Sequence, residues 1–319
     1  MKNIDLIVVG AGPSGLACAI EAGRKGLECL VIDKGSVADA IRRFPVNMTF
    51  FSTSELLEIG DIPFLSAGFR PTRVECVRYY QMVARKYGLK VEQGAEVVSL
   101  HRTSEGFKVV TSRSTHLSQY VVVAKGYFDD PNDFPVPGSQ LAKVNRYYLE
   151  PYEYSGLHVA VVGGRNSAVE TALDLFRNGA IVTLIHRGQS LSSGVKYWIL
   201  PDIENRIKAG EIRALFGTQV GEIRERSLVL TGTHAGEIPN DVVFVMIGYM
   251  PSMKLLRSAG VNTDPETLGP VYNPKTMETN VPGIYVAGSI AAGKFNNKIF
   301  IENGRAHGKL IVDAIAQAR

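Results

Sequence analysis

The sequence is poor in cysteine, and its cysteines form no recognisable set. Cys18, Cys29 and Cys76 lie far apart, are odd in number and include no CxxC pair. Such a set argues against a disulfide framework and against a zinc site. We therefore expect neither a bound metal nor a redox-active dithiol.

Long apolar runs and strong net charge are also missing. No run approaches the roughly 18 apolar residues that a membrane-spanning helix needs. The first apolar strand pattern begins at Leu6, which leaves no room for a signal peptide before it. Lys and Arg number 35 against 31 Asp and Glu, a net charge of +4 that falls short of a nucleic-acid-binding profile. These absences predict a cytoplasmic protein with no membrane and no nucleic-acid partner.

The length and composition are those of an ordinary globular protein with two domains. The 319 residues are 45% hydrophobic and 21% charged, and they exceed the usual size of one domain. A cluster rich in Pro and Asp at residues 129–138 reads as a linker. We place a first domain part at 1–125, a second domain at 126–251, and the remainder of the first domain at 252–319.

A dinucleotide-binding pattern opens the chain. A strand over residues 4–9 precedes the turn Gly10-Ala11-Gly12-Pro13-Ser14-Gly15, a helix to residue 25 and a second strand over 28–33. Gly10 permits the tight bend, Gly12 lets the backbone approach a pyrophosphate, and Gly15 lets helix and strand pack closely. Asp33 ends the second strand, where a carboxylate accepts hydrogen bonds from ribose hydroxyls. The pattern predicts a bound FAD.

The same pattern recurs 153 positions later. A strand over 158–162 leads to the turn Gly163-Gly164-Arg165-Asn166-Ser167-Ala168, a helix to residue 178 and a strand ending near His186. His186 stands where the first unit has Asp33, and Arg187 follows it. A carboxylate there would repel a 2′-phosphate, whereas His186, Arg187 and Lys196 can pair with one. We predict that this unit binds NADPH. Arg165 stands where the first turn has Gly12, and we interpret it as a phosphate contact.

A third segment, residues 279–289, is an apolar strand that ends in a small-residue turn at Gly288 and Ser289. Residues 297–316 then read as one helix. In this part the chain resembles the flavoprotein reductases with two dinucleotide domains, whose late motif places its last polar residue on the flavin ribitol. That residue is commonly Asp; Ser289 can still hydrogen-bond a hydroxyl. The resemblance also implies that the start of the helix, near Lys298, Ile299 and Phe300, points at the flavin pyrimidine.

A closer resemblance rests on stretches outside the Gly-rich turns, at residues 49–61, 196–201, 246–249 and 301–305, together with 163–168. These stretches look like the bacillithiol disulfide reductase family, relatives of the low-molecular-weight thioredoxin reductases that lack the CxxC dithiol. The resemblance implies an α/β protein of two Rossmann-like, three-layer ββα domains. It also implies NADPH-dependent reduction of a small disulfide through FAD, and a homodimer or homotetramer.

The pattern and the resemblance together select the site residues. FAD contacts are expected at Gly10, Gly12, Pro13, Ser14, Gly15, Asp33, Lys34, Thr49, Phe51, Val97, Ala124, Gly126, Gly288, Ser289 and Ile299. NADPH contacts are expected at Gly163, Arg165, Asn166, Ser167, His186, Arg187, Lys196 and Gly248. No catalytic residue is assigned, because Ser14 stands at the family's proposed redox thiol and cannot form a mixed disulfide.

Three other functions fit the same patterns. A ferredoxin or flavodoxin reductase of this architecture would also lack CxxC, and a flavin monooxygenase shares both Gly-rich turns. A non-catalytic NADPH or flavin sensor would bind both nucleotides without turnover. His307 could face the active site, although a structural histidine is the simpler interpretation. Cys18, Cys29 and Cys76 are expected to be packing residues.

Overall fold

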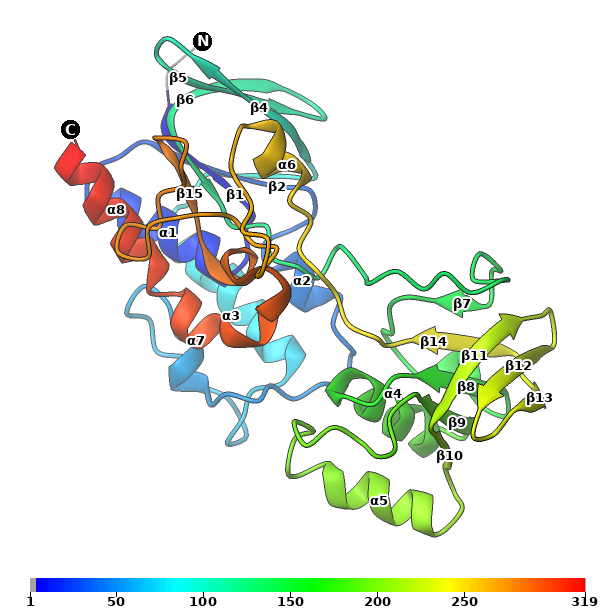
Figure 1. The fold of residues 1–319 in the computed structure, drawn as a ribbon. Helices are drawn as coiled ribbons and strands as arrows, with labels where there is room; N and C mark the ends of the chain where they lie inside the picture. Colours follow the sequence, from blue (N-terminus) through cyan, green and yellow to red (C-terminus); the bar gives the residue numbers. More distant parts are fainter. Residues whose placement is uncertain (1–3, 319) are drawn as a thin grey trace. The chain divides into compact units, whose positions relative to one another are not determined.

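The computed structural model describes residues 4–318 and divides into two compact units. The first unit comprises the described residues of 1–43, 49–130 and 250–319; the second comprises 44–48 and 131–249. Both are α/β units with a mainly parallel arrangement of strands and helices packed against it; the antiparallel strands continue the same sheet in the first unit and form a separate sheet in the second (Figure 1). The predicted pair of Rossmann-like, three-layer ββα units is confirmed.

The first unit is built on a seven-stranded sheet in the order β3-β2-β1-β6-β5-β4, with β15 paired to β6. β1, β2, β3, β6 and β15 pair in parallel, whereas β4, β5 and β6 form an antiparallel meander. β1 is buried on both faces because its residues are nearly all apolar. The strands are β1 (Ile4–Val9), β2 (Cys29–Asp33), β3 (Val91–Gln93), β4 (Val97–Thr103), β5 (Gly106–Thr111), β6 (Thr115–Val123) and β15 (Ile284–Val286).

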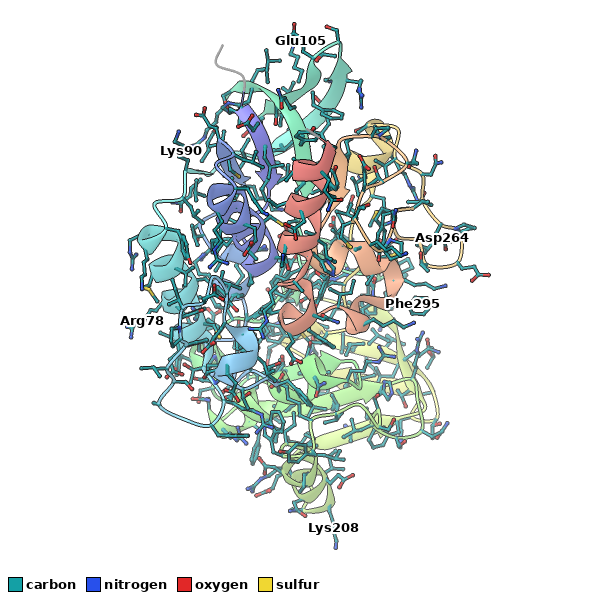
Figure 2. The ribbon with its side chains drawn as sticks, turned by 90° about the vertical axis from the view of Figure 1, so that its left-hand side faces the viewer. Arg78, Lys90, Glu105, Lys208, Asp264 and Phe295 are labelled. Atoms are coloured by element: carbon teal, nitrogen blue, oxygen red, sulfur yellow. The ribbon has the colours of Figure 1, made fainter. Side chains whose placement is uncertain are left out.

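Helices α1 (Pro13–Arg24) and α8 (His307–Ala318) lie side by side against this sheet (Figure 1). α3 is capped at its start by Thr72, whose hydroxyl accepts the Glu75 N–H while the Glu75 carboxylate accepts the Thr72 N–H. The other helical elements of this unit are α2 (Asp39–Arg42), η1 (Ser54–Leu57), α3 (Arg73–Lys86), α6 (Lys254–Ser258), η3 (Gly288–Lys298) and α7 (Ile301–Gly304). Arg78, Lys90, Glu105 and Asp264 extend from this unit into solvent (Figure 2).

The second unit has a five-stranded parallel sheet in the order β10-β9-β8-β14-β7 and a separate three-stranded antiparallel sheet, β11-β12-β13. One core lies between the parallel sheet and α4, and another lies between that sheet and the three-stranded sheet. The strands are β7 (Val144–Asn145), β8 (His158–Val162), β9 (Ile181–His186), β10 (Arg213–Phe216), β11 (Thr218–Ile223), β12 (Ser227–Gly232), β13 (Gly236–Pro239) and β14 (Val242–Val245). The helices are η2 (Tyr152–Tyr154), α4 (Asn166–Arg177) and α5 (Leu200–Lys208).

The predicted single helix over 297–316 is wrong. η3 ends at Lys298, Ile299 and Phe300 are extended, and two helices, α7 and α8, follow. The Asn303 side chain explains the break, because it accepts the Phe300 N–H (2.8 Å) and donates to the Lys298 carbonyl (2.8 Å). Asn303 thereby starts a new helix at Ile301 instead of extending one from residue 297.

The compact units change over at 130/131 and 249/250, where the sequence placed boundaries at 125/126 and 251/252. At these points the two crossing segments pair with each other. The Met250 N–H donates to the Asp130 carbonyl (2.8 Å), and the Asn132 N–H donates to the Gly248 carbonyl (3.0 Å). Residues 44–48, assigned to the first domain from sequence, belong to the second unit, where the Val46 N–H donates to the Leu149 carbonyl (2.7 Å).

Candidate functional site

The first Gly-rich turn needs glycine at two positions for steric reasons. Gly10 has φ +114°, and a Cβ there would lie 2.5 Å from the Ala124 carbonyl oxygen. A Cβ on Gly15 would lie 1.9 Å from the Gly10 carbonyl oxygen. Both contacts are with backbone, which cannot rotate away. The turn therefore keeps β1, β6 and α1 at a separation that only glycine allows.

Gly12 differs, because a Cβ there would meet no described protein atom within 4 Å. Its backbone is extended, with φ −76° and ψ 175°, a conformation that any residue adopts. Gly12 directly precedes α1, and Pro13 occupies the first turn of that helix. The first N–H groups of a helix of this length have no partner within the helix and favour an anion. The open space over Gly12 therefore fits a pyrophosphate group.

Asp33 holds this turn in place from the end of β2. Its Oδ2 accepts the Ala11 N–H (2.7 Å) and its Oδ1 accepts the Gly35 N–H (2.7 Å). Burial raises the pKa of Asp33, and the two N–H donors act in the opposite direction. Each carboxylate oxygen keeps a further lone pair, so Asp33 can accept ribose hydroxyls while it orients the turn.

Further predicted FAD residues gather where the parallel strands of the first unit end. The Ala124 N–H donates to the Val9 carbonyl (2.8 Å) and the Ala287 N–H to the Val123 carbonyl (3.0 Å), so β1, β6 and β15 end together. In parallel sheets ligands bind at this edge. Of the other predicted FAD residues, Lys34 pairs with Asp129 (3.1 Å), Thr49 forms a β-bridge with Thr72, Val97 begins β4, and Gly126 has φ +71°.

The two adjacent phenylalanines have opposite environments. Phe50 is buried, with 8% of its surface exposed, and its N–H donates to the Pro71 carbonyl (2.9 Å). Phe51 is 57% exposed. Phe50 is a core residue, and Phe51 is the one available to contact a ligand.

The turn after β15 meets the first Gly-rich turn. Gly288 has φ +70°, and a Cβ on it would lie 2.7 Å from the Ser14 hydroxyl oxygen. A Cβ on Gly304 of α7 would lie 3.0 Å from the same oxygen. The Ser289 hydroxyl oxygen lies 3.8 Å from the Cβ position of Gly126. Ser14, Gly126, Gly288 and Ser289, far apart in the sequence, therefore form one group.

Sequence reasoning gave no role to Ser52, Glu302 and Arg305, and it interpreted His307 as a structural histidine that could face the active site. The Ser52 hydroxyl donates to Glu302 of α7, a partner 250 positions away. Arg305 donates to the Glu58 carbonyl (2.6 Å), and His307 Nδ1 accepts the Gly288 N–H (3.1 Å). Ser52, Glu302 and Arg305 fall within the stretches 49–61 and 301–305 that carried the family resemblance. Their place in the two stretches was the one signal in the sequence, and it did not reveal that residues 49–61 and 301–305 contact each other.

The second Gly-rich turn repeats the steric logic of the first in the other unit. Gly163 has φ +149°, and a Cβ there would lie 2.5 Å from the Met246 carbonyl oxygen. Its N–H donates to the Ile185 carbonyl (3.0 Å), just as the Gly10 N–H donates to that of Ile32 (2.8 Å). The turn leads into α4, whose N-cap is Arg165. Its form fits a second dinucleotide.

His186 closes over this turn. A Cβ on Gly164 would lie 2.5 Å from three atoms of the imidazole, so the ring occupies the space that glycine leaves. Burial lowers the pKa of His186, and the cations of Arg187 and Arg165 lower it further. Both effects favour the uncharged ring, and the exposed Arg165 and Arg187 supply the positive charge that can attract a 2′-phosphate.

Lys196 does not join them in this structure. Its side chain is nearly buried, and Nζ lies 2.5 Å from Glu170 Oε1 on α4. Asn166 fixes the same segment, because its Oδ1 accepts the Lys196 N–H (2.8 Å) and its Nδ2 donates to the Gly194 carbonyl (3.0 Å). Burial raises the pKa of Glu170, with Lys196 opposing the shift. Because a buried carboxylate needs a cation, we propose that Lys196 pairs with Glu170 in place of the predicted 2′-phosphate contact, which stays untested.

The other predicted NADPH residues lie around the same turn. Ser167 is exposed in the first turn of α4, and Gly248, with φ +91°, follows β14. The Gly248 carbonyl accepts the Asn132 N–H.

None of the cysteines has the setting of a redox thiol. Cys18 and Cys76 are fully buried, and burial raises the pKa of both thiols well above the usual range. Burial raises the pKa of Cys29 to about 12. A thiol reacts as its thiolate, and burial disfavours that form for all three. The interpretation of Cys18 and Cys76 as core residues is confirmed.

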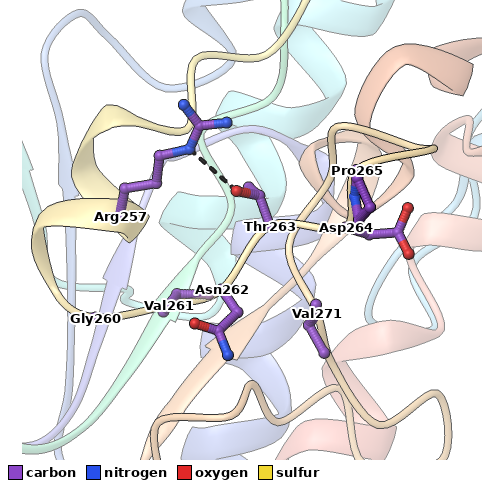
Figure 3. A pocket seen from close by; sticks show the side chains of 8 residues that line it. All are labelled: Arg257, Gly260, Val261, Asn262, Thr263, Asp264, Pro265 and Val271. Carbon is purple, nitrogen blue, oxygen red and sulfur yellow. Dashed lines mark hydrogen bonds between the residues drawn. The ribbon is translucent and has the colours of Figure 1, made fainter.

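A pocket of 640 Å³ in the first unit has no predicted cofactor residue in its lining (Figure 3). Three of its polar side chains have partners: Arg257 Nε donates to Thr263 Oγ1 (3.2 Å), and Asp264 accepts the N–H groups of Glu266 and Thr267. We assign it no ligand. Residues 4–318 contain no helix long and apolar enough to span a membrane.

Comparison with known proteins identifies similar chains. Residues 7–288 match the family model described as pyridine nucleotide-disulphide oxidoreductase. The bacilliredoxin reductase Bdr of Bacillus subtilis is 42% identical over 317 residues, which cover 98% of this chain and 97% of that protein. The structure of bacillithiol disulfide reductase Bdr (YpdA) from Bacillus cereus, 42% identical, covers both chains completely with a TM-score of 0.97. Thioredoxin reductase of T. acidophilum, 22% identical, has the same fold, with a TM-score of 0.79 over 100% of this chain and 99% of that one.

Proposed function

This chain belongs to the pyridine nucleotide-disulphide oxidoreductase family, and on that premise we propose that it reduces a low-molecular-weight disulfide, most specifically bacillithiol disulfide. It is an oxidoreductase that uses FAD and NADPH. The observation that carries the choice of substrate is the 42% identity, over nearly the whole length, to a protein named for bacillithiol chemistry.

The two Gly-rich turns support the assignment of one nucleotide to each unit. We propose that the first turn, with the open space over Gly12 and the carboxylate of Asp33, holds FAD. The second turn, with the exposed Arg165 and Arg187, holds NADPH. The two sites differ in charge at equivalent positions, and the cationic one suits the nucleotide with the extra phosphate. When bound, FAD supplies the chemistry that takes a hydride from NADPH and delivers two electrons to a disulfide.

The balanced reaction converts one disulfide, NADPH and a proton into two thiols and NADP⁺. Enzymes that relay electrons through their own thiols need an accessible thiolate, whereas Cys18 and Cys76 are buried, Cys29 is partly buried, and burial raises the pKa of all three thiols. Ser14 at the family's thiol position cannot replace them. We propose that this chain contributes no thiol to the reaction, and that its residues bind and orient the reactants.

Reductive titration tests the thiol-independent route. The FAD-loaded protein should take up two electrons per chain, and the triple variant Cys18→Ala, Cys29→Ala, Cys76→Ala should retain turnover. Uptake of four electrons, or loss of turnover in a triple variant that still folds and binds FAD, would contradict it.

Product counting tests the substrate assignment. Anaerobic FAD-loaded protein should form two thiols for each NADPH oxidised when bacillithiol disulfide is the acceptor. Faster reduction of a ferredoxin or flavodoxin would favour the ferredoxin reductase alternative, and NADPH-dependent oxygenation of an organic substrate would favour a monooxygenase. An absence of sustained NADPH oxidation with every acceptor would leave the sensor alternative. We also propose, from the resemblance alone, a cytoplasmic homodimer or homotetramer.

A further inference from the structure

The turn that follows β15 is held from three directions. On one side, the Ala287 N–H donates to the Val123 carbonyl of β6 (3.0 Å). On a second side, the Ser14 hydroxyl oxygen lies 2.7 Å from the Cβ position of Gly288. From α8, His307 Nδ1 accepts the Gly288 N–H (3.1 Å). The first is a hydrogen bond within the sheet, the second is a close approach of the Ser14 side chain, and the third is a hydrogen bond to the His307 side chain.

The Gly288 N–H needs a partner because it lies just beyond the strand ladder. The ladder between β6 and β15 ends with the Ala287 N–H, and Gly288 is itself buried. A buried N–H without an acceptor carries a substantial desolvation cost. His307 supplies the acceptor, and it can do so only while Nδ1 carries no proton, which places the hydrogen of the neutral ring on Nε2.

The position of His307 favours that neutral form. The residue is the first of α8, a helix of 12 residues, where the helix dipole disfavours a cation. Burial lowers the pKa of its imidazole in the same direction. Two independent features of the fold therefore keep His307 as an acceptor at neutral pH.

The turn after β15 also carries Ser289. Ser289 directly follows Gly288, and its hydroxyl oxygen lies 3.8 Å from the Cβ position of Gly126 at the ligand edge of the sheet. A change in the peptide plane at Gly288 therefore moves Ser289. Ser289 is neutral where related reductases commonly have Asp, so it depends on correct placement instead of charge to hold a ribitol hydroxyl.

We infer that His307 is a positioning residue of the FAD site, which acts by fixing the Gly288 peptide so that Ser289 faces the ribitol. This inference rests on the proposed binding of FAD by the first unit and not on the identity of the disulfide. His307 itself touches neither substrate nor reacting atoms in this scheme.

Two substitutions distinguish the effect of the hydrogen-bond acceptor from the effect of side-chain volume. His307→Leu fills similar space without an acceptor, whereas His307→Asn places a carbonyl oxygen near the position of Nδ1. The matched control is His101→Leu on β4, an exposed histidine that bonds to Ser99 (2.9 Å). Affinity for FAD, measured by flavin fluorescence quenching, and the midpoint potential of the bound flavin are the readouts.

We expect His307→Leu to weaken FAD binding by about 5- to 100-fold and to shift the midpoint potential. His307→Asn should recover most of the affinity and the potential, and His101→Leu should change neither. The inference is overturned if Asn is as weak as Leu, or if Leu binds FAD as the wild type does. These measurements use neither NADPH nor a disulfide. A protein that binds FAD but reduces no disulfide would therefore contradict the proposed substrate and would not contradict this inference.

If His307→Leu fails to fold, the tautomer of His307 in the wild-type protein tests the inference. In ¹⁵N spectra of the FAD-bound protein at neutral pH, His307 should show an unprotonated Nδ1 and a protonated Nε2. A proton on Nδ1 would overturn the inference, since that nitrogen could not accept the Gly288 N–H.

Discussion

Substituting Gly12 with alanine should separate the fold of the first turn from its ligand. A Cβ on Gly12 would meet no described protein atom within 4 Å, and its φ of −76° suits alanine. Without FAD, a poorer N-cap costs about 0.5 kcal/mol. Alanine also restricts the unfolded chain, which raises the free energy of unfolding by about 0.4–1 kcal/mol. The two effects on stability therefore nearly cancel. With FAD, a methyl group placed against the pyrophosphate costs about 1–3 kcal/mol, which corresponds to roughly 5- to 150-fold weaker binding.

Urea unfolding of the FAD-free protein and a fluorescence titration with FAD measure the two quantities. The matched control is Gly23→Ala, in the same helix, exposed and equally open. It should raise the free energy of unfolding by about 0.5–1 kcal/mol and leave FAD affinity unchanged. Unaltered FAD binding by Gly12→Ala would refute the reasoning, because it would mean that the open space is not where the phosphates lie.

Three further predictions concern the second unit. Arg187→Ala should raise the KM for NADPH by about 10- to 100-fold and barely alter that for NADH. Arg213→Ala, an exposed arginine at the opposite end of the neighbouring strand β10, should affect neither, and equal effects of Arg187→Ala on both nucleotides would exclude a 2′-phosphate contact. Lys196→Met should lower the free energy of unfolding by about 2–4 kcal/mol, because it leaves the partly buried Glu170 unpaired. The variant should keep the preference for NADPH over NADH. Loss of that preference would show that Lys196 contacts the 2′-phosphate. The pKa of His186 in the folded state is lowered below its ordinary value of 6.5. As the pH falls, the unfolded chain therefore takes up the proton before the folded protein does. The free energy of unfolding should decrease as the pH falls through 6.5 and below. Urea unfolding between about pH 7 and pH 5 should show a smaller loss for His186→Gln than for the wild type, and an equal loss would contradict the assignment.

The nucleotide-binding framework could be predicted from the sequence because its determinants are local. Gly10 and Gly163 each follow a buried strand directly, and the positive φ that favours glycine there belongs to the turn itself. Strands β1 and β8 were predicted with their observed bounds, and helices α1 and α4 to within a residue at their ends. Short-range patterns of this kind depend little on the rest of the fold.

Two of the features that could not be predicted depend on contacts between residues far apart in the sequence, and a third depends on a local side-chain hydrogen bond. Lys196 is a plausible phosphate ligand until Glu170 of α4 is brought against it. The helix expected at 297–316 breaks because a single side chain, Asn303, bonds back to the backbone at Lys298 and Phe300. His307 and Gly288 meet only after α8 packs beside α1 and the turn following β15. The Lys196 and His307 contacts are set by tertiary packing, on which residue spacing carries no information, whereas the Asn303 bonds are local and compete with the helical hydrogen bonds.

Anaerobic stopped-flow spectroscopy of the FAD-loaded protein tests the central claim most directly. NADPH should bleach the absorbance of the oxidised flavin, and bacillithiol disulfide, added next, should restore it as thiols form. A flavin that NADPH does not bleach would contradict the assignment of this chain as an NADPH-dependent disulfide reductase.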